Sequence, residues 1–208
     1  MTTEALSSLI ETLQFSNSQA SVILLRHSEH DGGVITERGK ILISEAVNKI
    51  NNYFLGDGPI HFQTSYSSTV SKSGQRRTEN TGLLLKAGLI GLPNSRFIPE
   101  GMVKRESFKG VPFGPNIPKT EPGASVKIAK NIDGLTTSLL LLEAKRPDLF
   151  KRGDQYTFIC ITHSEVLIPW LRSHGAYFAQ LEEMPRADPI FVKLNSGSLK
   201  IDYPRKIQ

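Results

Sequence analysis

Short apolar runs and amphipathic stretches alternate along this chain. Continuous apolar runs are typical of strands buried on both faces of a parallel sheet, whereas apolar residues recurring every three or four positions predict helices. The alternation predicts an α/β fold, a three-layer α/β/α sandwich with a mostly parallel central sheet. The expected strands are 21–25, 59–64, 96–99, 156–162, 189–194 and 199–203, and the expected helices are 37–54, 75–87, 125–144 and 166–174.

Three residues indicate where helices begin or end. Thr36 is of a type that caps helix N-termini, so the first helix is expected to start directly after it. Gly88 indicates the stop of the helix over 75–87. Pro169 is expected only in the first turn of its helix. The first helix has one apolar face expected to pack on the sheet, formed by Ile43, Ala46, Val47, Ile50 and Phe54.

The length of 208 residues suits one domain over 1–208. Residues 1–20 are expected to form a polar N-terminal helical extension. Composition is ordinary for a soluble protein, with 38% hydrophobic and 22% charged residues. No stretch approaches the roughly 20 apolar residues of a membrane span, and no secretory signal is recognisable, so we expect no membrane association. The one cysteine, Cys160, lies in an apolar run and predicts a buried core thiol in a cytoplasmic protein.

The net charge of +5 favours anionic ligands. Lysine and arginine residues are scattered along the chain rather than massed, and they are not interleaved with aromatic residues. We therefore expect small phosphorylated ligands rather than nucleic acid as partners. The oligomeric state stays open, with a homodimer among the options.

Two histidines each follow a strand that is expected to be buried. His27 comes after 21–25 and is preceded by Arg26, and His163 directly follows 156–162. Ligands of open α/β sheets bind beyond the carboxyl ends of the strands. The two imidazoles are therefore expected to converge on one site.

The segment 24–40, with the sequence LLRHSEHDGGVITERGK, resembles the signature of the histidine phosphatase superfamily, which includes the cofactor-dependent phosphoglycerate mutases. That signature has Arg-His-Gly after the first strand, and here Ser28 replaces the glycine. The resemblance implies a phosphoglycerate mutase-like fold in which His27 takes phosphate onto its imidazole.

Three weaker blocks follow in the order that the family has. The block over 76–85 implies Arg77 as a phosphate ligand, with Arg76 as the alternative. The block over 104–110 implies Glu106 as the proton donor. The block over 160–167 implies His163 as a catalytic pocket residue that also contacts phosphate. Glu165 is the alternative proton donor.

The chemistry of these residues is that of phosphoryl transfer. Guanidinium forks of Arg26 and Arg77 suit a phosphate dianion, and a neutral imidazole is a competent nucleophile. The sequence thus predicts a phosphatase that forms a phosphohistidine on His27 and needs no metal and no cofactor. A mutase-like phosphotransferase and a non-catalytic phosphate-binding regulatory protein are the alternatives. The loop over about 106–124, rich in Pro and Gly, is expected to cap the pocket and select the substrate, whose identity stays open.

Other polar residues are assigned structural roles. Glu29 is expected to cap or pair locally, and Ser164 is not expected to be a nucleophile because no flanking glycines form a nucleophile elbow. The remaining histidines, expected to be structural or superficial, are His30, His61 and His174.

Overall fold

The computed structural model describes residues 20–54, 60–66, 76–92, 95–97, 123–140, 155–175, 184–195 and 198–202. Its strands are β1 (Ala20–Arg26), β2 (His30–Asp31), β3 (Val34–Ile35), β4 (Ile60–Tyr66), β5 (Ser95–Phe97), β6 (Gln155–Thr162), β7 (Pro189–Asn195) and β8 (Ser198–Asp202). Its helices are α2 (Glu37–Tyr53), α3 (Arg77–Ile90), α4 (Ala124–Leu140) and α6 (Ser164–Ser173). The expected N-terminal extension and most of the expected capping loop lie outside these residues.

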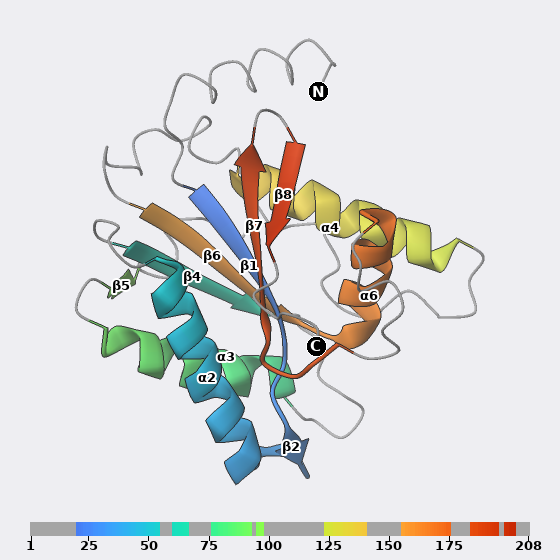
Figure 1. Cartoon of the computed structure of the whole chain (residues 1–208). Coiled ribbons are helices and arrows are strands. Elements are labelled where there is room, and N and C mark those ends of the chain that lie inside the picture. Colours follow the sequence, from blue (N-terminus) through green and yellow to red (C-terminus); the bar gives the residue numbers. More distant parts are fainter. Residues whose placement is uncertain are drawn as a thin grey trace.

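Six strands form one sheet in the order β5-β4-β6-β1-β7-β8, and β2 pairs with β3 in a small hairpin (Figure 1). Strands β5, β4, β6 and β1 are parallel to one another, whereas β7 pairs antiparallel with both β1 and β8. Helices α2 and α3 cover one face of the sheet, and α4 and α6 cover the other. The prediction of a three-layer sandwich with a mostly parallel sheet is confirmed.

Strands β1 and β6 end together, which positions the site. Arg26 is paired with Thr162 at the last position of the ladder, and the amide of His27 donates to the carbonyl of Thr162 at 3.0 Å. Both strands are buried along their whole length, as the apolar runs predicted. The residues that follow them therefore emerge at the same edge of the sheet.

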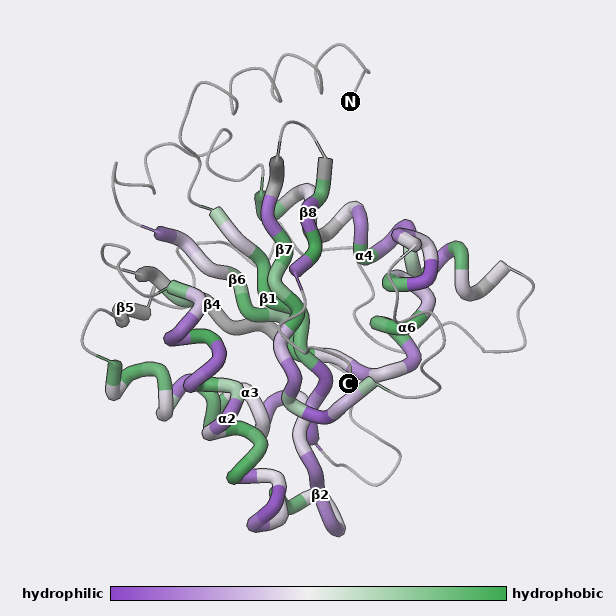
Figure 2. The backbone as a smooth tube through the Cα atoms, viewed as in Figure 1, coloured by the Kyte–Doolittle hydropathy of each residue, from purple (hydrophilic) through white to green (hydrophobic). Residues whose placement is uncertain are grey.

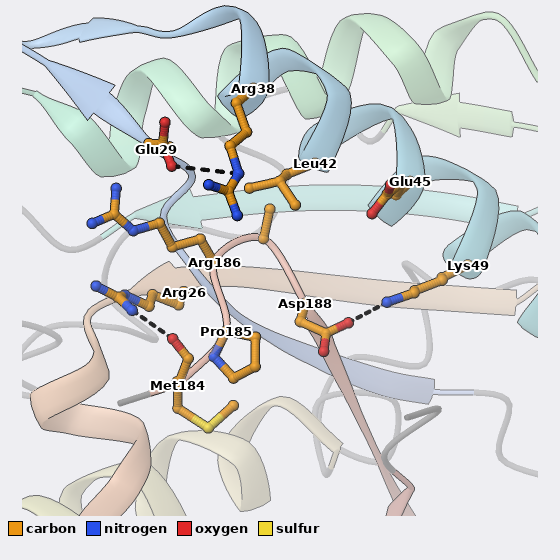
Figure 3. Close-up of a pocket in the computed structure, with 11 residues that line it drawn as sticks. Arg26, Glu29, Arg38, Leu42, Glu45, Lys49, Met184, Pro185, Arg186 and Asp188 are labelled. Carbon is orange, nitrogen blue, oxygen red and sulfur yellow. Dashed lines mark hydrogen bonds and ion pairs between the residues drawn. The ribbon is translucent and has the colours of Figure 1, made fainter. Parts of the chain in front are cut away.

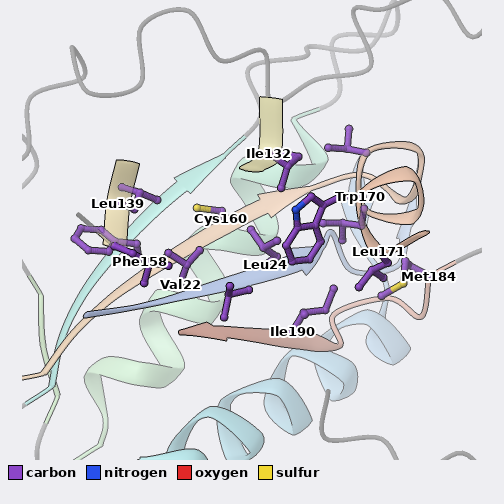
Figure 4. Close-up of a cluster of buried hydrophobic side chains, with 14 of the residues drawn as sticks. Val22, Leu24, Ile132, Leu139, Phe158, Cys160, Trp170, Leu171, Met184 and Ile190 are labelled. Carbon is purple, nitrogen blue, oxygen red and sulfur yellow. The ribbon is translucent and has the colours of Figure 1, made fainter. Parts of the chain in front are cut away.

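The core between the sheet and helices α4 and α6 is built around Trp170 (Figure 4). Its indole is fully buried, and its Nε1 donates to Asp133 Oδ1 at 2.7 Å, which satisfies the polar end of the ring. Cys160 is also fully buried in this cluster, so the prediction of a core thiol is confirmed. The central strands are largely hydrophobic, as Figure 2 shows.

The core on the opposite face confirms the predicted apolar side of α2 and corrects one helix end. All five residues of that side are buried, and Thr36 caps α2. Gly88, however, lies inside α3, which continues to Ile90 and is capped by Gly91. A Cβ at Gly88 would lie 2.7 Å from Val47 Cγ2, so this glycine allows α3 to pack closely on α2 rather than ending the helix.

Pro169 is a second correction. It lies in the middle of α6, beyond the first turn to which the sequence reasoning confined it. Proline inside a helix costs about 3 kcal/mol because it lacks an amide hydrogen. The helix persists because Leu167, Trp170 and Leu171 are buried around the proline, and each such side chain contributes about 1.5–3 kcal/mol. In the described part of the chain, no helix is long and apolar enough to cross a membrane.

Candidate active site

The two histidines predicted to converge do so. Their ring centroids are 5.1 Å apart, and the ring planes are inclined at 71°. His27 follows β1 and is 6% exposed, and His163 follows β6 and is half-buried. The edge of the sheet therefore brings together two imidazoles from distant parts of the sequence.

The backbone holds the ring of His27 in one tautomer. Its Nδ1 lies 2.8 Å from the carbonyl oxygen of Ser28. Because a carbonyl oxygen only accepts hydrogen bonds, Nδ1 carries the hydrogen, and Nε2 of the neutral ring keeps its lone pair. Burial lowers the pKa of His27 to about 4, against the opposing effect of the Ser28 hydrogen bond, and the charges of His163 and Arg26 act in the same direction as burial. Nε2 is thus unprotonated at neutral pH.

The turn after His27 is fixed by hydrogen bonds from both sides. Ser28 donates its amide to Thr81 Oγ1 at 3.0 Å and its hydroxyl to the carbonyl of Gly39 at 2.7 Å. The serine that replaces the expected glycine is fully buried and satisfied. At Gly39, a Cβ would collide with the carbonyl oxygen of Glu29 and would lie 2.8 Å from Ile35 Cγ2. Only glycine lets α2 approach this turn so closely.

Glu29 pairs locally, as predicted. Thr36 Oγ1 donates to Glu29 Oε1 at 3.0 Å and accepts from the amide of Gly39 at 3.0 Å. Arg38 Nε lies 3.9 Å from Glu29 Oε2. The carboxylate therefore braces the start of α2.

His163 is the N-cap residue of α6, and its carbonyl accepts from the amides of Val166 and Leu167. Burial lowers the pKa of His163, Glu165 raises it, and the charges of Arg26 and Arg77 lower it further. The acid and the two guanidinium groups therefore act on the pKa of His163 in opposite directions, and burial keeps that pKa below its ordinary value.

The three arginines near the site, Arg26, Arg76 and Arg77, differ in burial and in the groups that they interact with. Arg26 is 7% exposed, and its Nη1 donates to the carbonyl of Met184 at 2.5 Å. Arg77 lies close enough to lower the pKa of both His30 and His163. Arg76 has a side chain 64% exposed and pairs with Glu79 at 3.2 Å. Of the two alternatives, Arg77 is the one whose charge reaches the imidazoles.

His30 belongs to this cluster, although the sequence reasoning assigned it a structural or surface role. Its ring centroid lies 5.7 Å from that of His27, and its Nδ1 lies 2.8 Å from the same Ser28 carbonyl oxygen. Its Nε2 is buried and forms no hydrogen bond with any described residue. A histidine in a two-residue strand carries no sequence signal, so pattern reasoning could not find it. His174, by contrast, pairs with Asp133 at the surface as expected.

Of the two candidate proton donors, only Glu165 lies among the residues that the structure describes. Glu106 and its surrounding loop lie outside the described residues. Glu165 is exposed in the first turn of α6 and raises the pKa of His163. Within the described ranges, no group of three or more His, Cys, Asp or Glu residues is arranged to hold a metal ion.

Residues 184–188 form a segment that is anchored to Ser164, Arg26 and Lys49 and that the sequence did not reveal. Ser164 Oγ accepts from the amide of Met184 at 2.7 Å, and the amide of Ala187 donates to the carbonyl of Arg26 at 3.0 Å. Lys49 pairs with the buried Asp188. Ala187 has φ of 52°, a left-handed conformation that is strained for alanine.

A groove of about 460 Å³ runs between this segment and one face of α2 (Figure 3). Arg26 and Glu29 line the end nearest the imidazoles, and Lys49 and Asp188 line the other end. Arg186, half-buried, also lines the groove. Arg26 thus lines the groove and also lies close enough to His27 and His163 for its charge to lower their pKa values.

No protein-family model and no curated protein matches this sequence. Solved structures with a similar fold include YhfR of Bacillus stearothermophilus, which is 11% identical with a TM-score of 0.47, covering 91% of this chain and 98% of that one. The native mycobacterial glucosyl-3-phosphoglycerate phosphatase Rv2419c is 13% identical with a TM-score of 0.45, covering 88% and 97% of the two chains. Phosphoserine phosphatase from Entamoeba histolytica, in complex with 3-phosphoglyceric acid, is 12% identical with a TM-score of 0.44, covering 90% and 98%. At these identities and TM-scores the likeness says nothing of activity, so function has to be inferred from the site itself.

Proposed function

We propose that this protein is a histidine phosphatase that hydrolyses phosphomonoesters through a phosphohistidine on His27. The observation that carries the proposal is the hydrogen bond from Nδ1 of His27 to the Ser28 carbonyl. It leaves Nε2 unprotonated, and the lowered pKa keeps the ring neutral at pH 7.

Two displacements at phosphorus complete the proposed reaction. In the first, Nε2 of His27 attacks phosphorus, the bond from phosphorus to the ester oxygen breaks, and the leaving alkoxide takes a proton from a carboxylic acid. Glu106 is the proposed acid, and Glu165 is the alternative. In the second, water attacks the phosphohistidine, the P–N bond breaks, and inorganic phosphate leaves while the proton of the water returns to the carboxylate.

The charged groups around His27 suit a transferring phosphoryl group. Arg26 and Arg77 are proposed to bind the equatorial oxygens with their guanidinium forks. His163 is proposed to bind the same oxygens. Its pKa is lowered in the free protein, and a bound dianion would raise that pKa and favour the protonated imidazole.

Two alternatives share the site. A mutase-like phosphotransferase would return the phosphoryl group to a substrate hydroxyl instead of to water. A non-catalytic regulatory protein would bind phosphate in the same place without turnover. We also propose a cytoplasmic location and a single domain over residues 1–208, consistent with the one buried thiol.

The test is a screen of small phosphomonoesters with release of inorganic phosphate as the readout, without added metal and with a chelator, across about pH 5 to 8. Turnover in the native protein should fall by about 10⁴ or more in His27→Ala, because the nucleophile is lost. His174→Ala is the matched control, since that imidazole pairs with Asp133 away from the site and should leave turnover unchanged. Turnover that survives in His27→Ala would contradict the proposal, and absence of turnover in the native protein would favour the regulatory alternative.

A further inference from the structure

We propose that Arg186 and the groove beside it bind a second anionic group, a carboxylate or a phosphate, at the non-reacting end of the substrate. This inference rests on the proposed function, because it assigns the part of the substrate that His27 does not attack. It would make the protein selective for phosphomonoesters that carry another negative charge.

The first support is the position of Arg186. It lines the groove together with Arg26, and Figure 3 shows both guanidinium groups extending away from the Lys49–Asp188 pair. The charges of Arg77 and Arg186 lower the pKa of His30, and the charges of Arg26 and Arg77 lower the pKa of His163. Arg186 therefore lies on the His30 side of the cluster, beside the place proposed for the reacting phosphate.

The second support is that each of the other positive charges of the groove already has a partner within the protein. Arg38 faces Glu29, and Lys49 pairs with Asp188. Arg26 is held by the carbonyl of Met184. Among the described residues, Arg186 forms no hydrogen bond and no ion pair, so its guanidinium fork is available to a ligand.

The balance of charge also favours an anion at this end. The remaining acid of the groove, Glu45, projects from α2 on the side toward Lys49 in Figure 3. The end next to the imidazoles thus presents Arg26, Arg38 and Arg186, with only Glu29 as an opposing charge. That carboxylate is engaged by Thr36 and Arg38.

The third support is the rigidity of the segment that carries Arg186. Its two flanks are anchored by Ser164 and Arg26 on one side and by Lys49 on the other. Ala187, the next residue, is held in a left-handed conformation. Strained backbone of this kind is maintained where the surroundings fix it, and a preorganised arginine loses less entropy when it binds a ligand.

The test uses three non-hydrolysable probes with equal carbon chains: propylphosphonate, 3-phosphonopropionate and propane-1,3-bisphosphonate. Binding is measured by titration calorimetry on the full chain at pH 7. The native protein should bind at least one of the two probes that carry a second anionic group about tenfold more tightly than it binds propylphosphonate. The probe that gains affinity identifies whether a carboxylate or a second phosphate is recognised.

Arg186→Gln should reduce that ratio to within about twofold, because glutamine has no charge to offer the second anion. Arg172→Gln is the matched control, since Arg172 is exposed on α6 and does not line the groove, and it should keep the native ratio. Equal binding of all three probes by the native protein would overturn the inference, and so would an undiminished ratio in Arg186→Gln. Either result would leave the proposed function standing if His27→Ala still abolishes turnover.

Discussion

The junctions after β1 and after β6 occupy equivalent places on neighbouring parallel strands, yet they equip their histidines differently. After β1 the chain turns tightly, so that a backbone carbonyl holds Nδ1 of His27 and the ring is almost wholly buried. After β6 the chain enters a helix at once, and His163 is half-buried next to a carboxylate in the first turn. One junction keeps an imidazole neutral and oriented, and the other places its imidazole in a less buried position beside a carboxylate.

The largest expected effect is on the formation of a covalent phosphoprotein, which should depend on His27 and not on His163. With a phosphomonoester labelled in its phosphate, the native protein should form an acid-labile phosphoprotein. His27→Asn should abolish the label and lower turnover by about 10⁴ or more. His163→Asn should retain the label while turnover falls by about 10² to 10³, because it removes one stabilising donor rather than the nucleophile. Label lost equally in both variants would mean that the junctions do not differ in this way.

The next effect is on stability against pH. The pKa of His27 is about 4 in the folded protein and about 6.5 in the unfolded chain, so between these values the unfolded chain binds more protons. The free energy of unfolding should therefore fall as pH drops from 6.5 toward 4, by about 3 kcal/mol from His27 alone. Burial acts in the same direction on His30 and His163.

Urea unfolding at a series of pH values measures this effect. His27→Gln should flatten the profile more than His163→Gln, since the site at His163 contains an acid that opposes the shift. Equal flattening in the two variants would remove the distinction between the junctions.

The third effect tests the support under the first junction. Gly39→Ala should destabilise the protein by about 2 kcal/mol or more, because the new Cβ collides with the backbone oxygen of Glu29 in the turn after His27. Gly134→Ala is the matched control: it is also a helical glycine, but a Cβ there meets nothing within 4 Å, so it should stabilise α4 by about 0.5–1 kcal/mol. Thermal unfolding of both variants checks the contrast, and equal stability would show that α2 can shift away from the turn.

The pattern of apolar and polar residues predicted most of the fold. Strands buried on both faces of the sheet are continuous apolar runs in the sequence, so their positions could be read directly. The pattern failed at Gly88 and Pro169, where contacts between helices outweigh local preference. Within the site, the positions of His27 and His163 followed from the ends of two strands. Arg186 and His30 had no such signal, because they lie in irregular or very short segments whose position is set by distant residues such as Ser164 and Arg26.

The left-handed backbone at Ala187 has a consequence for the groove beside it. This conformation costs alanine about 1 kcal/mol that glycine would not lose, while its buried methyl group contributes a similar amount by packing. In Ala187→Gly the relief of the backbone strain and the loss of the methyl group would therefore nearly cancel in the free energy of unfolding. The backbone next to Arg186 would nevertheless gain conformational freedom. If Arg186 binds a second anionic group as proposed, this exchange would change the selectivity of the groove more than the stability of the fold.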